Sequence, residues 1–109
     1  MARSDALQGA LPMLVLKTLA RRGPMHGYAI TTHIETLSSD VLRVEEGSLY
    51  PALHRLEESR LVKARWAVTA NNRRARVYEI TPAGRRQLDA EEKRWHAVTL
   101  AVTDALERI

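Results

Sequence analysis

Cysteine is absent from this chain of 109 residues, so a disulfide framework and thiolate chemistry are both excluded. Long apolar runs are absent as well. The N-terminal segment ALPMLVLKTLA is too short to span a bilayer, and Lys17 interrupts it. The residues RRG follow it, where a signal peptide would have the small residues of a cleavage site. We therefore expect a soluble, cytoplasmic protein without a membrane partner.

Motifs for catalysis and for metal binding are also missing. The chain has no HExxH zinc motif, no glycine-rich phosphate loop, and no nucleophile with a base at a workable spacing. Of its four histidines, His26 and His33 are seven residues apart. On a helix this is about 10.5 Å along the axis, too far for both to bind one ion. We expect a protein that is not an enzyme and that needs neither a metal nor a cofactor.

Acidic residues are scarce in the segment from Arg60 to Arg86. It contains eight basic residues and a single acid, Glu79. These eight are about half of the 17 lysines and arginines in a chain of net charge +4. Such an excess favours a polyanionic partner, although many ordinary proteins also have a basic surface. The length indicates one domain, near the size at which a second copy of the chain often adds stability.

Apolar residues predict two helices in the N-terminal part of the chain. The segment from Met13 to Ala20 is apolar on nearly every side, which indicates a central helix covered by others. Pro12 then lies near the first turn of this helix, or inside the helix if it begins near Asp5. The sequence RRGPMHG ends it, and a second helix is expected from about Gly27 to Leu37.

The segment EEGSLYPALHRLEESRLV, from Glu45 to Val62, predicts a third helix. Its apolar residues have the i, i+3, i+4, i+7 spacing of a helix with one buried face: Leu49, Ala52, Leu53 and Leu56. Ser48 is expected to cap this helix, which places Pro51 inside the first turn. The opposite face carries hydrogen-bonding and basic groups: Ser48, Tyr50, His54 and Arg55. This face is either an ordinary solvated surface or one that binds a partner.

Two β-strands are predicted next. In LVKARWAV, one set of alternate residues is mainly apolar: Val62, Ala64, Trp66 and Val68. The segment RVYEIT is rich in β-branched and aromatic residues, and the asparagines of TANNRRA suit a turn between the two. Together they predict an antiparallel hairpin with a basic tip. Trp66 lies on the inner face of the first strand, where we expect it to pack against the core.

A long helix is predicted to follow the hairpin. Thr81 is expected to cap it, and Pro82 suits its first position. Apolar residues along it are separated by 3, 4, 3 and 4 positions: Trp95, Val98, Val102, Ala105 and Ile109. A narrow apolar seam with this period is typical of a helix that packs against a partner helix.

The predicted order of three helices, a hairpin and a long helix is the plan of a winged helix-turn-helix domain. The fold class is therefore mainly α with a small β-hairpin. We expect residues 1–81 to form the DNA-binding domain and residues 82–109 to form a dimerisation helix. In such a domain the third helix lies in the major groove of DNA, and the hairpin, or wing, reaches along the backbone.

Three blocks of the sequence resemble the PadR family of transcriptional regulators, over nearly the whole chain. They are LVLKTLARRGPMHGYAI, EEGSLYPALHRLEESRLV and RRARVYEITPAGRRQL. The chain is similar to the short subgroup, whose members dimerise through the last helix. This resemblance implies a homodimeric bacterial repressor of detoxification, efflux or stress genes that a small molecule releases from DNA. Family wings commonly have Gly or Pro before the paired arginines, where this sequence has Asn71 and Asn72.

The expected DNA contacts come from the start of the second helix, the open face of the third, and the hairpin: His26, Gly27, Tyr28, Ser48, Tyr50, Pro51, His54, Arg55, Lys63, Arg73, Arg74 and Arg76. Tyr28 is equally suited to the core. A dimer presents two third helices related by a two-fold axis, so the expected partner is double-stranded DNA with an inverted repeat.

The expected dimerisation residues lie on the last helix: Leu88, Trp95, Val98, Val102, Ala105, Leu106 and Ile109. Some short members of the family hold flat aromatic compounds between paired tryptophans of this helix. By that resemblance, Trp95 is the candidate residue for binding a small aromatic effector.

A winged helix that binds another protein is the alternative hypothesis. Its binding face would be apolar at the centre and poor in charge. The open face of the third helix is instead rich in hydroxyl groups and arginine, and it precedes a basic hairpin. The sequence therefore favours DNA as the partner.

Overall fold

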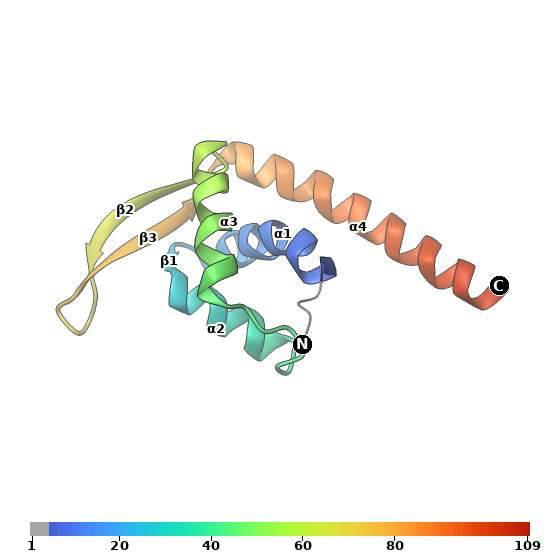
Figure 1. Ribbon diagram of the computed structural model, residues 1–109. Helices are drawn as coiled ribbons and strands as arrows, with labels where there is room; N and C mark the ends of the chain where they lie inside the picture. The colour runs from blue at the N-terminus through green and yellow to red at the C-terminus, as the bar shows by residue number, and fades with distance from the viewer. Residues whose placement is uncertain (1–4) are drawn as a thin grey trace.

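The computed structural model describes residues 5–109, and it describes the side chains of residues 9–109 (Figure 1). Its elements in chain order are α1 (Asp5–Arg22), β1 (Met25–His26), α2 (Gly27–Leu37), α3 (Glu46–Glu58), β2 (Val62–Val68), β3 (Arg74–Ile80) and α4 (Pro82–Arg108). The wing formed by β2 and β3 projects from one side of the helical body, and α4 extends from the body on the opposite side (Figure 1). The predicted fold class is confirmed.

Helix α1 lies at the centre of the domain, as its apolar sequence predicts. It packs against α2, α3 and α4, and its most enclosed residues are Leu11, Val15, Leu16 and Leu19. Of the two possible starts for this helix, the structure has the earlier one, Asp5, so Pro12 lies in the interior. Because proline has no amide hydrogen, the helix loses one backbone hydrogen bond there. An ion pair of 2.9 Å between Lys17 and Glu92 joins α1 to α4.

Helix α3 begins earlier than the sequence suggests. The carbonyl of Glu45 already accepts hydrogen bonds from the amides of Ser48 and Leu49, at 3.0 and 2.9 Å. Glu45 is therefore the N-cap, and the prediction that Ser48 caps the helix is wrong. Pro51 consequently lies in the second turn, not in the first. Its missing hydrogen bond would have been made to the carbonyl of Gly47, four residues earlier.

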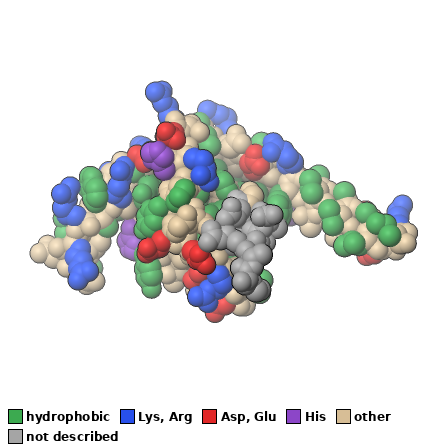
Figure 2. Space-filling view, viewed as in Figure 1, with side chains coloured by type: hydrophobic (Ala, Val, Ile, Leu, Met, Phe, Trp, Pro, Cys, Tyr) green, Lys and Arg blue, Asp and Glu red, His purple; other side chains and the backbone are tan. Residues whose placement is uncertain are grey.

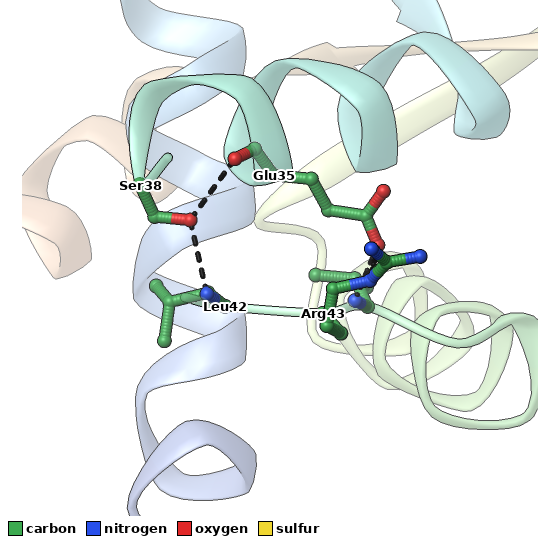
Figure 3. Close-up of polar contacts among 5 residues, drawn as sticks. Glu35, Ser38, Leu42 and Arg43 are labelled. Atoms are coloured by element: carbon green, nitrogen blue, oxygen red, sulfur yellow. Dashed lines mark hydrogen bonds and ion pairs between the residues drawn. The ribbon is translucent and has the colours of Figure 1, made fainter. Parts of the chain in front are cut away.

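The connection between α2 and α3 is held by Glu35 of α2 and by Ser38, the C-cap of that helix. The carboxylate of Glu35 accepts a hydrogen bond of 2.9 Å from the amide of Val44 and lies 3.5 Å from Nε of Arg43. The hydroxyl of Ser38 donates to the carbonyl of Glu35 and accepts from the amide of Leu42 (Figure 3). These contacts tie the segment that leads into α3 to the C-terminal end of α2.

Replacing Glu35 with alanine is expected to lower the free energy of unfolding by about 1–3 kcal/mol, because the amide of buried Val44 loses its partner. Urea denaturation measures this change. The matched control is Asp89→Ala, which removes an exposed carboxylate paired with Lys93 one helical turn away. The control should change stability by less than about 0.5 kcal/mol. Equal effects from the two substitutions would contradict the role given to Glu35.

The sheet has three antiparallel strands in the order β1-β3-β2. Strands β2 and β3 form the predicted hairpin, with Val62 opposite Ile80 at its base and Val68 opposite Arg74 near its tip. Strand β1 was not predicted. It consists of Met25 and His26 alone, paired with β3, and two residues are too few to show a strand period.

The inner face of the hairpin runs from the core out into solvent. Val62 and Tyr78 are buried, whereas Trp66, on the same face, is 57% exposed. The prediction that Trp66 packs against the core is therefore wrong. Alternation places its side chain on the correct face, but the hairpin is longer than the core beneath it, so its outer half forms an overhanging wing.

The start of α4 is the one predicted from TPAG. The hydroxyl of Thr81 accepts a hydrogen bond of 3.0 Å from the amide of Gly84, and Pro82 opens the helix. Gly84 is required sterically, because a Cβ atom there would collide with the carbonyl oxygen of Leu61. Leu88 is buried in the core of its own protomer. Its assignment to a dimer seam is therefore corrected, because its surface is already covered.

Candidate nucleic-acid interface

Helix α3 has one buried and one open face, as its spacing predicts. The buried residues are Leu49, Ala52, Leu53 and Leu56. The open face carries exposed Tyr50, Pro51, His54 and Arg55, with Ser48 half-buried. Of these, His54 lies 3.6 Å from Glu58, one turn along the helix. The predicted DNA-contacting side chains of α3 are thus together on one surface.

The start of α2 lies against this open face. A Cβ atom on Gly27 would lie 2.7 Å from the hydroxyl oxygen of Tyr50, so Gly27 is buried beneath that ring. Gly27 therefore makes room for Tyr50 and offers little surface to DNA, which corrects its predicted role as a direct contact. Nδ1 of His26 caps α2 by accepting from the amide of Ala29 at 3.3 Å. Tyr28 is 72% exposed, so it belongs to the surface and not to the core.

The wing tip is a tight turn. The amide of Thr69 donates a hydrogen bond of 2.7 Å to the carbonyl of Arg73. The carbonyl of Thr69 accepts one of 2.9 Å from the amide of Asn72. The φ angle of Asn72 is +58°, a conformation that asparagine adopts more readily than most residues. Asn72 therefore allows a tight turn here without the Gly or Pro that the family resemblance led us to expect. Basic side chains lie along this wing in Figure 2 (blue, left).

Trp66 is the residue of this surface that the sequence did not indicate. Its ring lies opposite Arg76 across the strands, and the Cζ atoms of Arg74 and Arg76 are 4.8 and 5.7 Å from the ring centroid. Such distances allow a cation–π interaction, which restricts the directions that both arginines take. The proximity of Trp66 to Arg74 and Arg76 could have been predicted only from the pairing register of β2 and β3, which the length of the turn between them sets.

A recess of about 640 Å³ separates the wing from the starts of α2 and α3. Its lining is aromatic and basic: His26, Tyr28, Tyr50, Trp66, Arg73, Arg74, Arg76 and Tyr78 are among its residues. The pKa of Tyr78 is raised above its ordinary value, mainly because the side chain is buried. The guanidinium of Arg76 acts in the opposite direction and lowers this pKa, whereas the carboxylate of Glu57 raises it. Tyr78 therefore stays neutral at ordinary pH, and the positive charge of the recess comes from the arginines.

Lys63 and Arg76 each lie near a carboxylate. Lys63 is at the base of the hairpin, 4.0 Å from Glu79. It is an odd number of residues from Trp66 along the strand. Lys63 and the ring of Trp66 therefore lie on opposite faces of β2. Arg76 donates a hydrogen bond of 2.9 Å to Glu57 of α3, a partner that nothing local in the sequence indicates.

The chain is similar to known proteins in both sequence and fold. The sequence profile of the transcriptional regulator PadR-like family matches residues 15–90. The chain belongs to this family. The resemblance seen in the sequence blocks is thereby confirmed, and the family comprises transcriptional regulators, not enzymes. PadR-like regulators bind DNA and typically dimerise.

Three relatives illustrate the similarity. A transcriptional regulator from Clostridium thermocellum has a TM-score of 0.84 at 25% identity, covering 93% of this chain and 97% of that one. A PadR-like transcriptional regulator from Bacillus cereus has a TM-score of 0.80 at 26% identity, covering 94% and 97%. A transcriptional regulator of Mycobacterium tuberculosis is 43% identical over 69 residues, which are 63% of this chain and 61% of that protein.

The second predicted surface of this PadR-like regulator is the apolar stripe of α4. Trp95, Val98 and Val102 are 43%, 52% and 52% exposed. Ala105, Leu106 and Ile109 are also exposed. Side chains of this kind at coiled-coil spacing leave a continuous apolar surface without cover in a single protomer.

None of the helices in residues 5–109 is long and apolar enough to cross a membrane. Among the side chains of residues 9–109, no three His, Asp or Glu lie close enough together to hold a metal ion.

Proposed function

We propose that this PadR-like regulator binds an inverted-repeat DNA operator as a homodimer. Helix α3 of each protomer enters a major groove through Tyr50, His54 and Arg55, and the wing follows the backbone with Arg73 and Arg74. The observation that carries the proposal is the position of the open face of α3. It adjoins the arginine-lined recess of the wing, so that groove and backbone contacts are available to one protomer at once.

The apolar stripe of α4 supplies the dimer contact in this proposal. Its spacing suits a partner helix, and Trp95, Val98 and Val102 would lose their exposure in such a pairing. The two α3 helices would then lie one turn of DNA apart, at about 34–36 Å or a multiple of it. A division at residue 81 fits this arrangement, although the first turns of α4 also pack in the DNA-binding domain through Gly84 and Leu88.

We further propose that the regulator is a repressor that a small aromatic effector releases from DNA. Trp95 supports this, because its half-exposed indole lies on the proposed dimer stripe and offers a flat aromatic surface to such a ligand. An effector there would act by favouring a dimer whose two α3 helices are wrongly spaced. It can shift that balance only by its difference in affinity for the two arrangements.

Fluorescence anisotropy tests the proposal. The labelled duplexes are the DNA upstream of the regulator's own gene and a scrambled duplex of equal length, each at several salt concentrations. Specific binding predicts a preference of about 10³-fold or more for the upstream DNA. Arg55, Arg73 and Arg74 of both protomers predict a log–log salt slope of about −5. Weak and equal binding to both duplexes would contradict the proposal and favour the protein-binding alternative.

A further inference from the structure

An ion pair joins the wing to helix α3. Nη2 of Arg76, on β3, donates a hydrogen bond of 2.9 Å to Oε2 of Glu57, which lies in the last turn of α3. The two side chains are 40% and 35% exposed. The pair therefore links, directly and near the surface, the two elements that must contact DNA together if the proposed function holds.

The guanidinium of Arg76 is turned toward the protein. One of its nitrogens, Nε, is buried and has no hydrogen-bond partner among the described residues. Its Cζ atom lies 5.7 Å from the ring of Trp66, and its charge is already matched by Glu57. Arg74, next but one along the strand, is exposed, and no ion pair is found for it with any described carboxylate. Two arginines on one face of the wing thus have different surroundings.

We propose that Glu57 and Arg76 are a positioning pair, which sets the angle of the wing against α3 and thereby the affinity for the operator. Arg76 acts on DNA through this pair, whereas Arg74 contacts the backbone itself. This inference rests on the proposed function, because the wing and α3 must bind one stretch of DNA for their relative angle to matter.

The position of the pair explains why it is needed. Along the inner face of the hairpin, core contact ends at Tyr78, and Trp66 beyond it is exposed. The overhanging part of the wing is therefore held by few apolar contacts, and a hydrogen-bonded ion pair there restricts its direction. A half-exposed pair adds little to the stability of the fold. Its loss should thus alter DNA binding far more than folding.

The substitution Glu57→Gln gives a test in which the sign of the effect decides. Simple electrostatics predicts tighter DNA binding, because a negative charge near the DNA backbone is removed and Arg76 is released toward the phosphates. The positioning role predicts the opposite. We expect Glu57→Gln to bind the upstream DNA about tenfold more weakly than the wild type, with an unchanged far-UV circular dichroism spectrum.

The matched control is Glu58→Gln, which removes the same charge from the next residue of α3. Glu58 is 66% exposed, and among the described residues its ion-pair partner is His54. This variant should bind DNA as tightly as the wild type or more tightly. In the double variant Glu57→Arg with Arg76→Glu, the pair is reversed. It should bind the upstream DNA to within about threefold of the wild type, whereas Glu57→Arg alone should not.

Three outcomes separate the claims. If Glu57→Gln binds as tightly as Glu58→Gln, or if the reversed pair restores nothing, the positioning role is overturned and the proposed function stands. If the wild type shows no preference for its upstream DNA, the proposed function fails and this inference fails with it. If weak binding by Glu57→Gln is accompanied by restored binding of the reversed pair, the positioning role is established.

Discussion

Replacing both Tyr50 and Arg55 with alanine is expected to abolish specific DNA binding, while the helical circular dichroism spectrum stays that of the wild type. Both side chains are on the open face of α3, and Tyr50 is 44% exposed. Each lost contact of this kind costs about 1–3 kcal/mol, and both protomers lose two, so we expect a loss of more than about a thousandfold in affinity. Anisotropy titration of the upstream duplex measures it.

The control for this pair is Arg86→Ala. It removes one positive charge from each protomer, as the double variant does, but from the exposed surface of α4. It should change affinity by less than about threefold, because Arg86 is not one of the proposed DNA contacts and salt screens the charge of an exposed side chain. If the Tyr50 and Arg55 double variant retained the affinity of this control, α3 would not be the recognition helix.

Replacing Val98 and Val102 with aspartate is expected to prevent the proposed dimer from forming and to leave monomers. Both residues are on the apolar stripe of α4, each 52% exposed in a single protomer. Packing two stripes together would bury four unpaired carboxylates, and each buried ion costs several kcal/mol. Sedimentation velocity should then show one species near the mass of a single chain, 12.3 kDa. Binding to the upstream DNA should fall as well, because the half-sites are no longer bound by one linked pair.

His96→Asp with Leu100→Asp is the matched control for the stripe. The two positions have the same spacing on α4, and the helical period places them on the side opposite Val98 and Val102. Both are exposed. This variant should still sediment as a dimer. A dimer from the Val98 and Val102 variant would show instead that the protomers associate through another surface.

The elements with strong local signals could be predicted from the sequence. Helix α2 has the predicted bounds, Gly27 and Leu37. Helix α4 begins, as predicted, after the cap Thr81 and with Pro82 as its first residue. The start of α3 was misplaced because Ser48 is a favourable cap residue, whereas the actual cap, Glu45, has no capping hydrogen bond from its side chain. Backbone hydrogen bonds set this boundary, and the side-chain preferences do not reveal it.

The candidate site depends more on tertiary structure. Periodicity predicted which face of α3 is buried and which face of β2 points inward. It did not predict where along β2 the core ends, and Trp66 is exposed because it lies beyond that point. The pairing of Arg76 with Glu57 joins residues 19 apart in different elements. Leu88 continues the apolar pattern of α4, yet it is buried by its own domain. The exposure of Trp66, the ion pair of Arg76 and the burial of Leu88 all depend on how the elements pack together, and no local sequence pattern indicates this packing.

Hydroxyl-radical footprinting of the wild type on its upstream DNA tests the central claim most directly. A dimer with two α3 helices and two wings predicts a protection pattern with two-fold symmetry, whose halves are centred about 10 base pairs apart or a multiple of that. The flanking protection should disappear in a variant with Arg73 and Arg74 replaced by alanine, while the central protection remains. A single unsymmetrical footprint, or one that this variant leaves unchanged, would contradict the account.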